Sequence, residues 1–193
     1  GGAFTDCSFT GKFNNELNTG DARIDMNSVL EFVNFNGNFE KIPISSKRIR
    51  VSNLKNPYLE CDIKSSFALT ALNELTGSTT LQFQKGTGDI DIEFKGPISG
   101  RDSVNSGIDG TISINNATVK YIPRNVTLFQ CSGDLVFKEK DLRVQKFSAR
   151  TGDTELLMNG SAKNFLSLLN ISPEKLTLRW DVYSPQLHLK DFR

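Results

Sequence analysis

The sequence predicts a mostly β protein, a curled antiparallel sheet built from two related repeats that each end in a short α-helix. Two observations predict the sheet: apolar and polar residues alternate along many segments, and glycine-rich turn signals separate these segments. A third observation predicts the repeats, because the same order of glycines and strand motifs occurs twice in the 193 residues. Stacked units share one elongated core, which favours a scaffold or conduit over a compact catalytic pocket.

The two copies span residues 11–72 and 110–169. Each begins with a glycine, continues through a second glycine-led strand and then a strand with an Arg-Val pair, and ends in an apolar stretch. Corresponding positions, first copy before second, are Gly11 and Gly110, Gly37 and Gly133, Leu54 and Phe147, and Phe67 and Phe165. We therefore divide the chain into a first β repeat at 1–98, a polar loop at 99–109 and a second β repeat at 110–193.

Residues 81–95 give the clearest hairpin in the first repeat. Two alternating strands flank the turn signal Lys-Gly-Thr-Gly at 85–88, where glycine supplies the positive φ of a tight turn. Gly96-Pro97 ends the second strand, since proline cannot donate to a ladder. The apolar residues of the two strands are Leu81, Phe83, Ile90, Ile92 and Phe94.

The second repeat continues the alternation over about five further strands. Ile112 and Ile114 share one face of its first strand, and Asn115-Asn116 bends or bulges that strand. Residues 187–189 (Leu-His-Leu) form the last expected strand, with the histidine facing solvent. In all, we expect roughly a dozen strands.

Helical spacing marks the end of each copy. In the first copy, apolar residues between Phe67 and Leu75 fall on one stripe of a helix. In the second copy, residues 165–169 (Phe-Leu-Ser-Leu-Leu) match about two helical turns, and Pro173 ends them.

Composition excludes several classes of function. Charge is nearly balanced, with 23 Lys and Arg against 22 Asp and Glu, and no basic cluster predicts a nucleic-acid partner. The first residues, Gly-Gly, suggest a piece cut from a longer protein. The spacing of Cys7, Cys61 and Cys131 matches no metal-binding or redox motif, and we interpret them as small buried apolar residues. The alternative is one disulfide, either Cys7–Cys61 or Cys61–Cys131.

Few residues offer catalytic chemistry. His188 is the only histidine, so a multi-histidine metal site is excluded. Asp89, Asp91 and Glu93 lie on one face of a strand. This pattern is typical of a solvent-exposed strand face, and it also matches a carboxylate cluster that binds a cation or acts in catalysis. A hydrolase that uses Asp89, Asp91 or His188 is the least favoured interpretation, and we expect no enzyme and no cofactor.

The second repeat resembles the C-terminal region of AsmA-like proteins. The segments that carry the resemblance are Gly110–Tyr121, Ser132–Phe137, Leu142–Ala149, Leu156–Gly160, Asn164–Leu169 and Leu187–Phe192. The resemblance covers residues 110–192, and the internal repeat extends it to the first copy.

The resemblance implies a place in the bacterial envelope. AsmA-like proteins and their TamB relatives are anchored in the inner membrane and project into the periplasm as long curled β-sheets with an apolar groove. They are associated with outer-membrane assembly and phospholipid movement between membranes, as bridge-like lipid-transfer proteins are. The family carries over no catalytic residues, and the envelope protein partners stay unknown.

A non-enzymatic lipid-binding module is therefore the first expectation for this chain. Phospholipid acyl chains would lie on an apolar face, and the alternative for the same residues is a buried core beneath the two helices. A rival interpretation is a protein- or glycan-binding β module of an envelope or surface protein, although one Trp and three Tyr are few for such a surface. The candidate lining residues are Leu81, Phe83, Ile90, Ile92, Phe94, Ile112 and Ile114.

Overall fold

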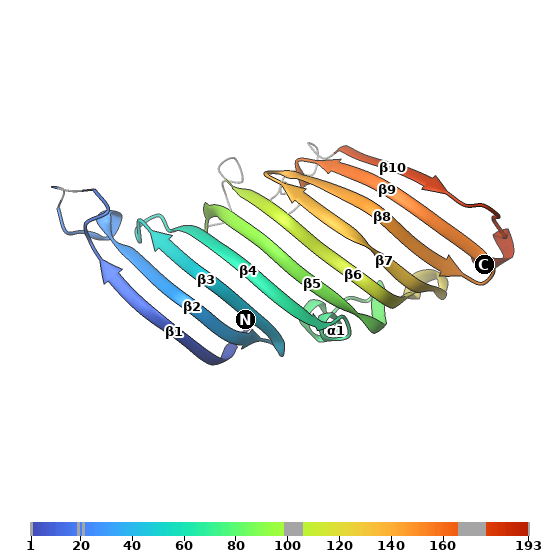
Figure 1. Ribbon diagram of the computed structural model, residues 1–193, viewed down its shortest axis with the longest axis horizontal. Helices are drawn as coiled ribbons and strands as arrows, with labels where there is room; N and C mark the ends of the chain where they lie inside the picture. Colours follow the sequence, from blue (N-terminus) through green and yellow to red (C-terminus); the bar gives the residue numbers. More distant parts are fainter. Residues whose placement is uncertain (1, 19, 21, 99–105, 166–176, 193) are drawn as a thin grey trace.

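The computed structural model describes residues 2–18, 20, 22–98, 106–165 and 177–192. Within them, ten strands form one antiparallel sheet in which every strand pairs with the next along the chain, from β1 to β10 (Figure 1). The strands are β1 (Phe4–Asn14), β2 (Val29–Phe39), β3 (Ile42–Ser52), β4 (Tyr58–Ala68), β5 (Leu81–Pro97), β6 (Gly107–Tyr121), β7 (Val126–Lys138), β8 (Asp141–Thr151), β9 (Thr154–Lys163) and β10 (Thr177–Tyr183). The mostly β, antiparallel class is confirmed.

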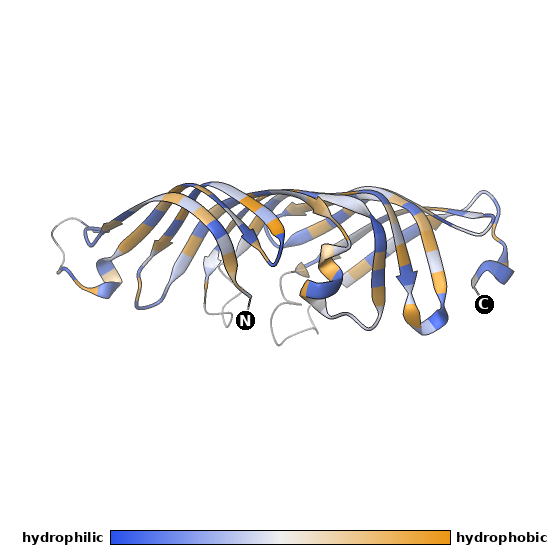
Figure 2. Cartoon of the chain, turned by 90° about the horizontal axis from the view of Figure 1, so that it is seen from below, coloured by the Kyte–Doolittle hydropathy of each residue, from blue (hydrophilic) through white to orange (hydrophobic). Residues whose placement is uncertain are grey.

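The sheet is an open arch. Figure 1 places β1 at one end of the molecule and β10 at the other, and Figure 2 shows the ribbon curved along its length with α1 (Ala71–Thr76) beneath it. The other helical elements of the described residues are the 3-10 turns η1 (Asp25–Asn27), η3 (Ile122–Arg124) and η6 (Leu189–Phe192). One face of the arch is therefore concave along the long axis.

The expected first helix is displaced. Phe67 and Ala68 are the last residues of β4, where Phe67 pairs with Gly88 of β5, so α1 begins only at Ala71. At these positions the hydrogen-bonded pairing of β4 with β5 determines the structure, although the apolar residues have helical spacing. The expected second helix, 165–169, falls almost wholly on residues 166–176, which lie outside the described residues. Two repeats that each end in a helix are thus not seen.

The expected hairpin at 81–95 is wrong. Residues 81–97 form the single long strand β5, which pairs with β4 on one side and β6 on the other. The glycine signal marks a β-bulge, because the register with β6 shifts between Phe83 and Thr87, and Gly86 has a φ of +112°. A Cβ on Gly86 would lie 2.5 Å from the Cα of Ala117, so β6 leaves no space for a side chain there.

Bulges of this kind occur in most strands. An inserted residue bends its strand and increases the local twist, which curls the sheet. The expected break at Asn115-Asn116 is confirmed as one of them, since the register with β7 shifts beyond Ile114. Residues inside strands with positive φ are Asp6, Asn34, Gly86, Gly110, Asn116, Gln130 and Lys146.

At several bulges, a polar side chain of the following strand accepts the backbone N–H groups that the bulge leaves unpaired. At the register shift in β3, both oxygens of the Asp62 carboxylate are used: Oδ2 accepts the backbone N–H of Lys47 at 3.0 Å, and Oδ1 accepts that of Arg48 at 3.0 Å and the Ser46 hydroxyl at 3.1 Å. These bonds replace ladder bonds that the bulge removes. Asp62 thus fixes the bend from the neighbouring strand.

The same arrangement recurs in the second half of the sheet. Ser132 Oγ of β7 accepts the backbone N–H of Asn116 in β6 at 3.0 Å. Asn159 Oδ1 of β9 accepts the backbone N–H of Lys146 in β8 at 3.0 Å. A polar residue of the next strand therefore repeatedly stabilises the curve.

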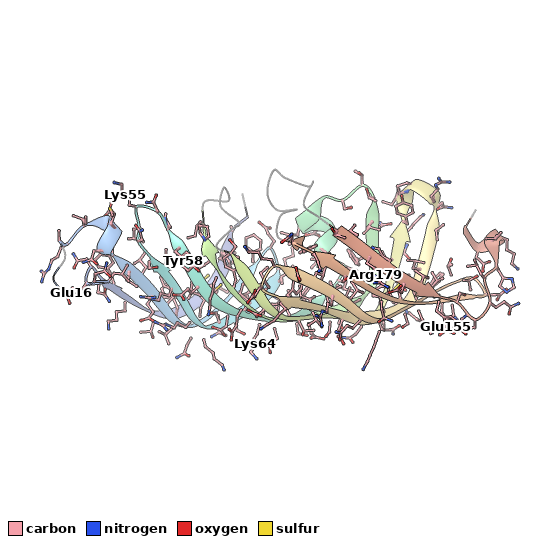
Figure 3. The ribbon with its side chains drawn as sticks, turned by 90° about the horizontal axis from the view of Figure 1, so that it is seen from above. Glu16, Lys55, Tyr58, Lys64, Glu155 and Arg179 are labelled. Atoms are coloured by element: carbon pink, nitrogen blue, oxygen red, sulfur yellow. The ribbon has the colours of Figure 1, made fainter. Side chains whose placement is uncertain are left out.

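The register sorts the side chains into an apolar and a polar face. Residues directly opposite each other share a face, and Ile90, Ile112 and Leu135 lie opposite one another across β5, β6 and β7. Lys64, on the other face of β4, lies on the convex side of the arch in Figure 3 and forms an ion pair with Asp91 at 2.7 Å. The apolar face is therefore the concave one.

Glycines on the concave face lie beside large side chains. A Cβ on Gly88 would meet the ring of Phe67 at 3.1 Å, and a Cβ on Gly133 would lie 2.7 Å from the Cα of Phe147. A Cβ on Gly160 would lie 2.7 Å from the indole of Trp180. Side chains converge on the inside of a curve, so glycine opposite an aromatic ring gives the space that a tight curl requires.

The C-terminal segment folds back onto the β8–β9 turn, so the strand expected at 187–189 is absent. Asp191 Oδ2 accepts the backbone N–H of Asp153 at 3.1 Å, the backbone N–H of Thr154 at 3.2 Å and the Thr154 hydroxyl at 2.9 Å. Thr154 is fully buried, and its Oγ1 also accepts the His188 N–H. Residues 189–192 form η6 because these bonds hold them against the turn.

Removing the Asp62 carboxylate tests its role at the bulge. We expect Asp62→Ala to lower the free energy of unfolding by about 1 to 3 kcal/mol, since three donors lose their acceptor. Asp91→Ala is the matched control on the same face, and loss of its exposed ion pair costs less than about 1 kcal/mol. Urea unfolding followed by circular dichroism measures both, and equal effects of the two changes would contradict this role.

The shifted pKa of Asp62 predicts how the free energy of unfolding changes with pH. Partial burial raises the pKa of Asp62, but the hydrogen bonds from Lys47, Arg48 and Ser46 together hold the pKa below its ordinary value. A carboxyl with a depressed pKa contributes stability above its unfolded pKa of about 3.9. The advantage of the wild type over Asp62→Asn is then lost as pH falls through the folded pKa, and a constant difference down to about pH 2 would contradict this.

Candidate functional site: the apolar concave face

All seven predicted lining residues lie on the concave face. Ile90 lies opposite Ile112, and Ile114 lies opposite Gly88. Beyond the Gly86 bulge the alternation shifts by one residue, and this shift keeps Leu81 and Phe83 on the same face, opposite Tyr121 and Val119. The remaining pairs are Ile92 with Gly110 and Phe94 with Ile108.

Six of the seven side chains are half-buried, and Leu81 is 41% exposed. Phe83, Ile90 and Ile114 pack against a cluster of buried residues, and Ile112 packs against a second cluster with Phe137 and Leu142. The first cluster comprises Ile42, Phe67, Leu69, Ala117, Cys131 and Ala149. The face is thus neither a sealed core nor a flat exposed surface.

Helix α1 covers one part of the concave face. Ala71 and Leu72 pack against the first cluster, near Leu69, which is 3% exposed. Among the described residues there is one sheet and no second sheet layer above it. A core beneath a helix is therefore present near α1, and a second buried cluster lies at Phe137, Leu142 and Ala162, with Phe165 packed against it. Among the described residues, apolar side chains at both ends of the face remain accessible.

The β1–β2 end of the face is aromatic. The ring centroids of Phe4 and Phe35 are 5.7 Å apart with an edge-to-face geometry, and those of Phe9 and Phe32 are 5.1 Å apart at 82°. Phe4 and Phe39 are 5.0 Å apart. The rings of Phe9 and Phe35, whose centroids are 6.1 Å apart, join these pairs, so five rings form a continuous aromatic patch.

The β10 end of the face is also apolar and exposed. Leu178, Trp180 and Val182 alternate along β10 and lie opposite Ala162, Gly160 and Met158 of β9. They are 55%, 53% and 58% exposed, respectively. The apolar face therefore extends from one edge of the sheet to the other. The sequence reasoning missed both ends, although alternation at Phe9, Phe13, Leu178 and Trp180 was the available signal.

The polar face holds a shallow hollow of about 770 Å³. Two of the three residues of the predicted acidic row, Asp89 and Asp91, line this hollow, and Glu93 lies outside it. Asp89 Oδ2 accepts a hydrogen bond from the Asn115 amide at 2.9 Å, and Asp91 Oδ2 accepts one from Lys64 at 2.7 Å. Hydroxyl, amide and carboxylate groups from six strands line the hollow. No group of three or more His, Cys, Asp or Glu suited to a metal occurs in the part of the chain that is described.

The candidate hydrolytic residues are not brought together. His188 contacts Thr154 of β9, whereas Asp89 and Asp91 lie on β5, four strands away. At about 4.8 Å per strand, this separation is roughly 19 Å, too far for a shared proton transfer.

The three cysteines are free thiols. Neither of the two disulfides that the sequence left open is formed. Burial raises the pKa of Cys131 to about 11, and burial also raises the pKa of Cys61. Thiols with raised pKa values are poor nucleophiles at neutral pH. Cys131 is a small buried apolar residue, as expected, whereas Cys7 is exposed.

No family model, curated protein or solved structure matches this chain. None of the helices in the described ranges is long and apolar enough to span a bilayer. The function proposed for this chain therefore depends on its own residues and geometry.

Asn73 fixes α1 to the sheet, a role that no local sequence pattern signals. Its amide pairs with both backbone groups of Phe83: Nδ2 donates to the carbonyl at 2.7 Å, and Oδ1 accepts the N–H at 2.8 Å. The side chain thereby takes the place of a neighbouring strand where β5 extends beyond β4. This pairing determines how far α1 covers the concave face.

We expect Asn73→Ala to release α1. Loss of both hydrogen bonds lowers the free energy of unfolding by about 1 to 2 kcal/mol and accelerates hydrogen exchange at the Phe83 amide. Glu74→Ala is the control, because it removes only an exposed ion pair with Lys41, worth less than about 1 kcal/mol. Hydrogen exchange by NMR measures the effect, and unchanged protection at Phe83 would contradict it.

Proposed function

We propose that this chain is a non-enzymatic lipid-binding module in which acyl chains lie along the concave face while headgroups stay in water. The observation that carries the proposal is the continuous apolar face across all ten strands, arched and without a second sheet layer in the described residues. Monomeric proteins rarely leave so large an apolar surface without a partner. A curved apolar strip fits a flexible chain better than it fits a compact ligand.

The energetics require no specific polar contact. Covering one CH₂ group stabilises by about 0.8 kcal/mol, so about ten covered groups contribute on the order of 8 kcal/mol before ordering costs. Half-buried side chains such as Ile92 and Ile112 provide the contact area. Binding of this kind discriminates weakly between headgroups, because they remain in solvent.

We further propose that the chain is an AsmA-like periplasmic module of a longer, inner-membrane-anchored protein, active in outer-membrane assembly or phospholipid transport between membranes. The curled antiparallel sheet supports this proposal. In this view the repeat unit is five strands, β1–β5 and β6–β10. Gly37 near the end of β2 and Gly133 in β7 would be corresponding positions, and both lie beside aromatic rings.

The alternative is a glycan- or protein-binding β module that uses the polar face. The hollow of about 770 Å³ and its hydroxyl, amide and carboxylate lining favour this alternative. The hollow contains no aromatic side chain to stack on a sugar ring. We therefore place lipid binding first.

Native mass spectrometry with lipid extraction tests the proposal. We expect phospholipid to co-purify with the wild type from a bacterial host. Ile92→Asp places a carboxylate on the concave face and should reduce bound lipid at least about tenfold, since burying an unpaired charge costs several kcal/mol. Gln82→Asp is the matched control: it adds the same group to the polar face of the same strand, opposite Lys120.

Circular dichroism establishes that both variants are folded. Lipid retained by Gln82→Asp and lost by Ile92→Asp supports the concave face as the site. Absence of lipid from the folded wild type, or equal loss in both variants, would exclude it.

A further inference from the structure

We propose that the strand ends beside α1 form a docking surface for anionic lipid bilayers. This surface consists of the end of α1, the first residues of β5 and the turn between β6 and β7, and we call it the α1 rim. The rim lies in the middle of the strand order, so its exposure does not depend on where the sheet begins or ends. Three features support the proposal: exposed apolar side chains, their position on a projection, and unpaired cations beside them.

Four apolar side chains of the α1 rim are exposed to solvent. Leu81 of β5 lies directly opposite Tyr121 of β6. The next residue, Ile122, donates its backbone N–H to the Thr80 carbonyl at 3.0 Å, which holds the η3 turn against the start of β5. These three side chains and Leu75, near the end of α1, are between 38% and 43% exposed. The fold therefore gathers exposed apolar residues from three segments at one edge of the sheet.

The α1 rim projects on the concave side of the arch. Figure 3 shows the segment from α1 to β5 in green and the β6–β7 turn in yellow, and both rise above the curved floor of the sheet. Figure 1 places α1 and this turn along the same edge of the sheet. A flat partner such as a bilayer can therefore meet the rim without touching the convex polar face.

Unpaired cations accompany the apolar side chains. Lys120 directly precedes Tyr121, Arg124 is the last residue of η3, and Lys85 lies further along β5. None of these three cations forms an ion pair with a described residue. The acidic residue of α1, Glu74, is already paired with Lys41 at 2.7 Å. The positive charge of the rim thus remains available to an anionic partner.

The combination of apolar side chains and cations favours an anionic bilayer over other partners. Apolar side chains enter the boundary between headgroups and acyl chains, and Lys and Arg are attracted to the anionic headgroups. Tyrosine suits this boundary, because its ring is apolar and its hydroxyl is polar. A nucleic acid would use the cations and leave the apolar side chains in water. A bilayer uses both.

The α1 rim is continuous with the concave face. Leu81 belongs both to the rim and to the predicted lining residues, and Phe83 follows it on the same face, opposite Val119. A bilayer docked on the rim would therefore meet the apolar face at its border. Docking itself requires no acyl chain on the concave face, so the two proposals can fail independently.

Cosedimentation with lipid vesicles tests the α1 rim. The probes are vesicles of phosphatidylcholine alone and vesicles in which part of it is replaced by phosphatidylglycerol, which is anionic. We expect the wild type to bind the anionic vesicles at least about tenfold more tightly than the neutral ones. Raising the NaCl concentration from about 0.1 M to about 0.5 M should weaken this binding, because salt screens the attraction between the cations and the bilayer.

Two variants separate the charge from the apolar contact. Arg124→Glu changes the charge of the rim by two units and should weaken binding to anionic vesicles about thirtyfold, at about 1 kcal/mol per unit charge. Ile122→Asp should weaken it at least about tenfold, because a carboxylate replaces a side chain that enters the bilayer. Lys55→Glu is the matched control: it makes the same charge change in the exposed β3–β4 loop at the opposite strand ends and should leave binding unchanged.

Circular dichroism confirms that each variant is folded, and lipid extraction from the same samples reports on the concave face separately. Loss of vesicle binding by Arg124→Glu and Ile122→Asp but not by Lys55→Glu supports the α1 rim, whether or not lipid co-purifies with the protein. The proposal is overturned if the wild type does not bind anionic vesicles or binds neutral ones equally well. Equal losses in Arg124→Glu and Lys55→Glu, or full binding by Ile122→Asp, would also overturn it.

Discussion

The structure depends on how the backbone groups at its β-bulges are satisfied. A bulge frees N–H groups from the ladder, and a polar side chain of a neighbouring strand accepts them: Asp62 for Lys47 and Arg48, and Ser132 for Asn116. Each bulge adds bend and twist, so a series of them curls ten strands into an arch. The curl makes the apolar face concave, and the glycines beside Phe67 and Phe147 leave room for it.

A one-layer sheet has a limited core. Buried apolar residues gather in two clusters, one of them beside α1, and the rest of the concave face stays half-exposed. A domain of this size normally buries its apolar face against a second layer. The proposed binding of acyl chains along the arch would cover this exposed apolar face.

Alternation in the sequence was sufficient to predict the sheet and the shared face of Ile90, Ile112 and Ile114. It was insufficient at Gly86, because a glycine in a turn and a glycine in a bulge leave the same local signal, and only pairing with β4 and β6 distinguishes them. The helix expected from Phe67 begins later for a similar reason, because only the pairing of Phe67 and Ala68 with β5 shows that these residues belong to β4. The role of Asn73 depends on a contact with Phe83, which no local pattern encodes.

Photolabelling tests most directly whether acyl chains lie on the concave face. A phosphatidylcholine with a diazirine on its acyl chain, bound to the folded protein and irradiated, reacts with the side chains that surround the acyl chain. We expect adducts on concave-face residues such as Ile92, Ile112 and Leu135, with few on polar-face residues such as Lys64 and Asp91. Adducts spread equally over both faces, or confined to the polar hollow, would contradict lipid binding on the concave face.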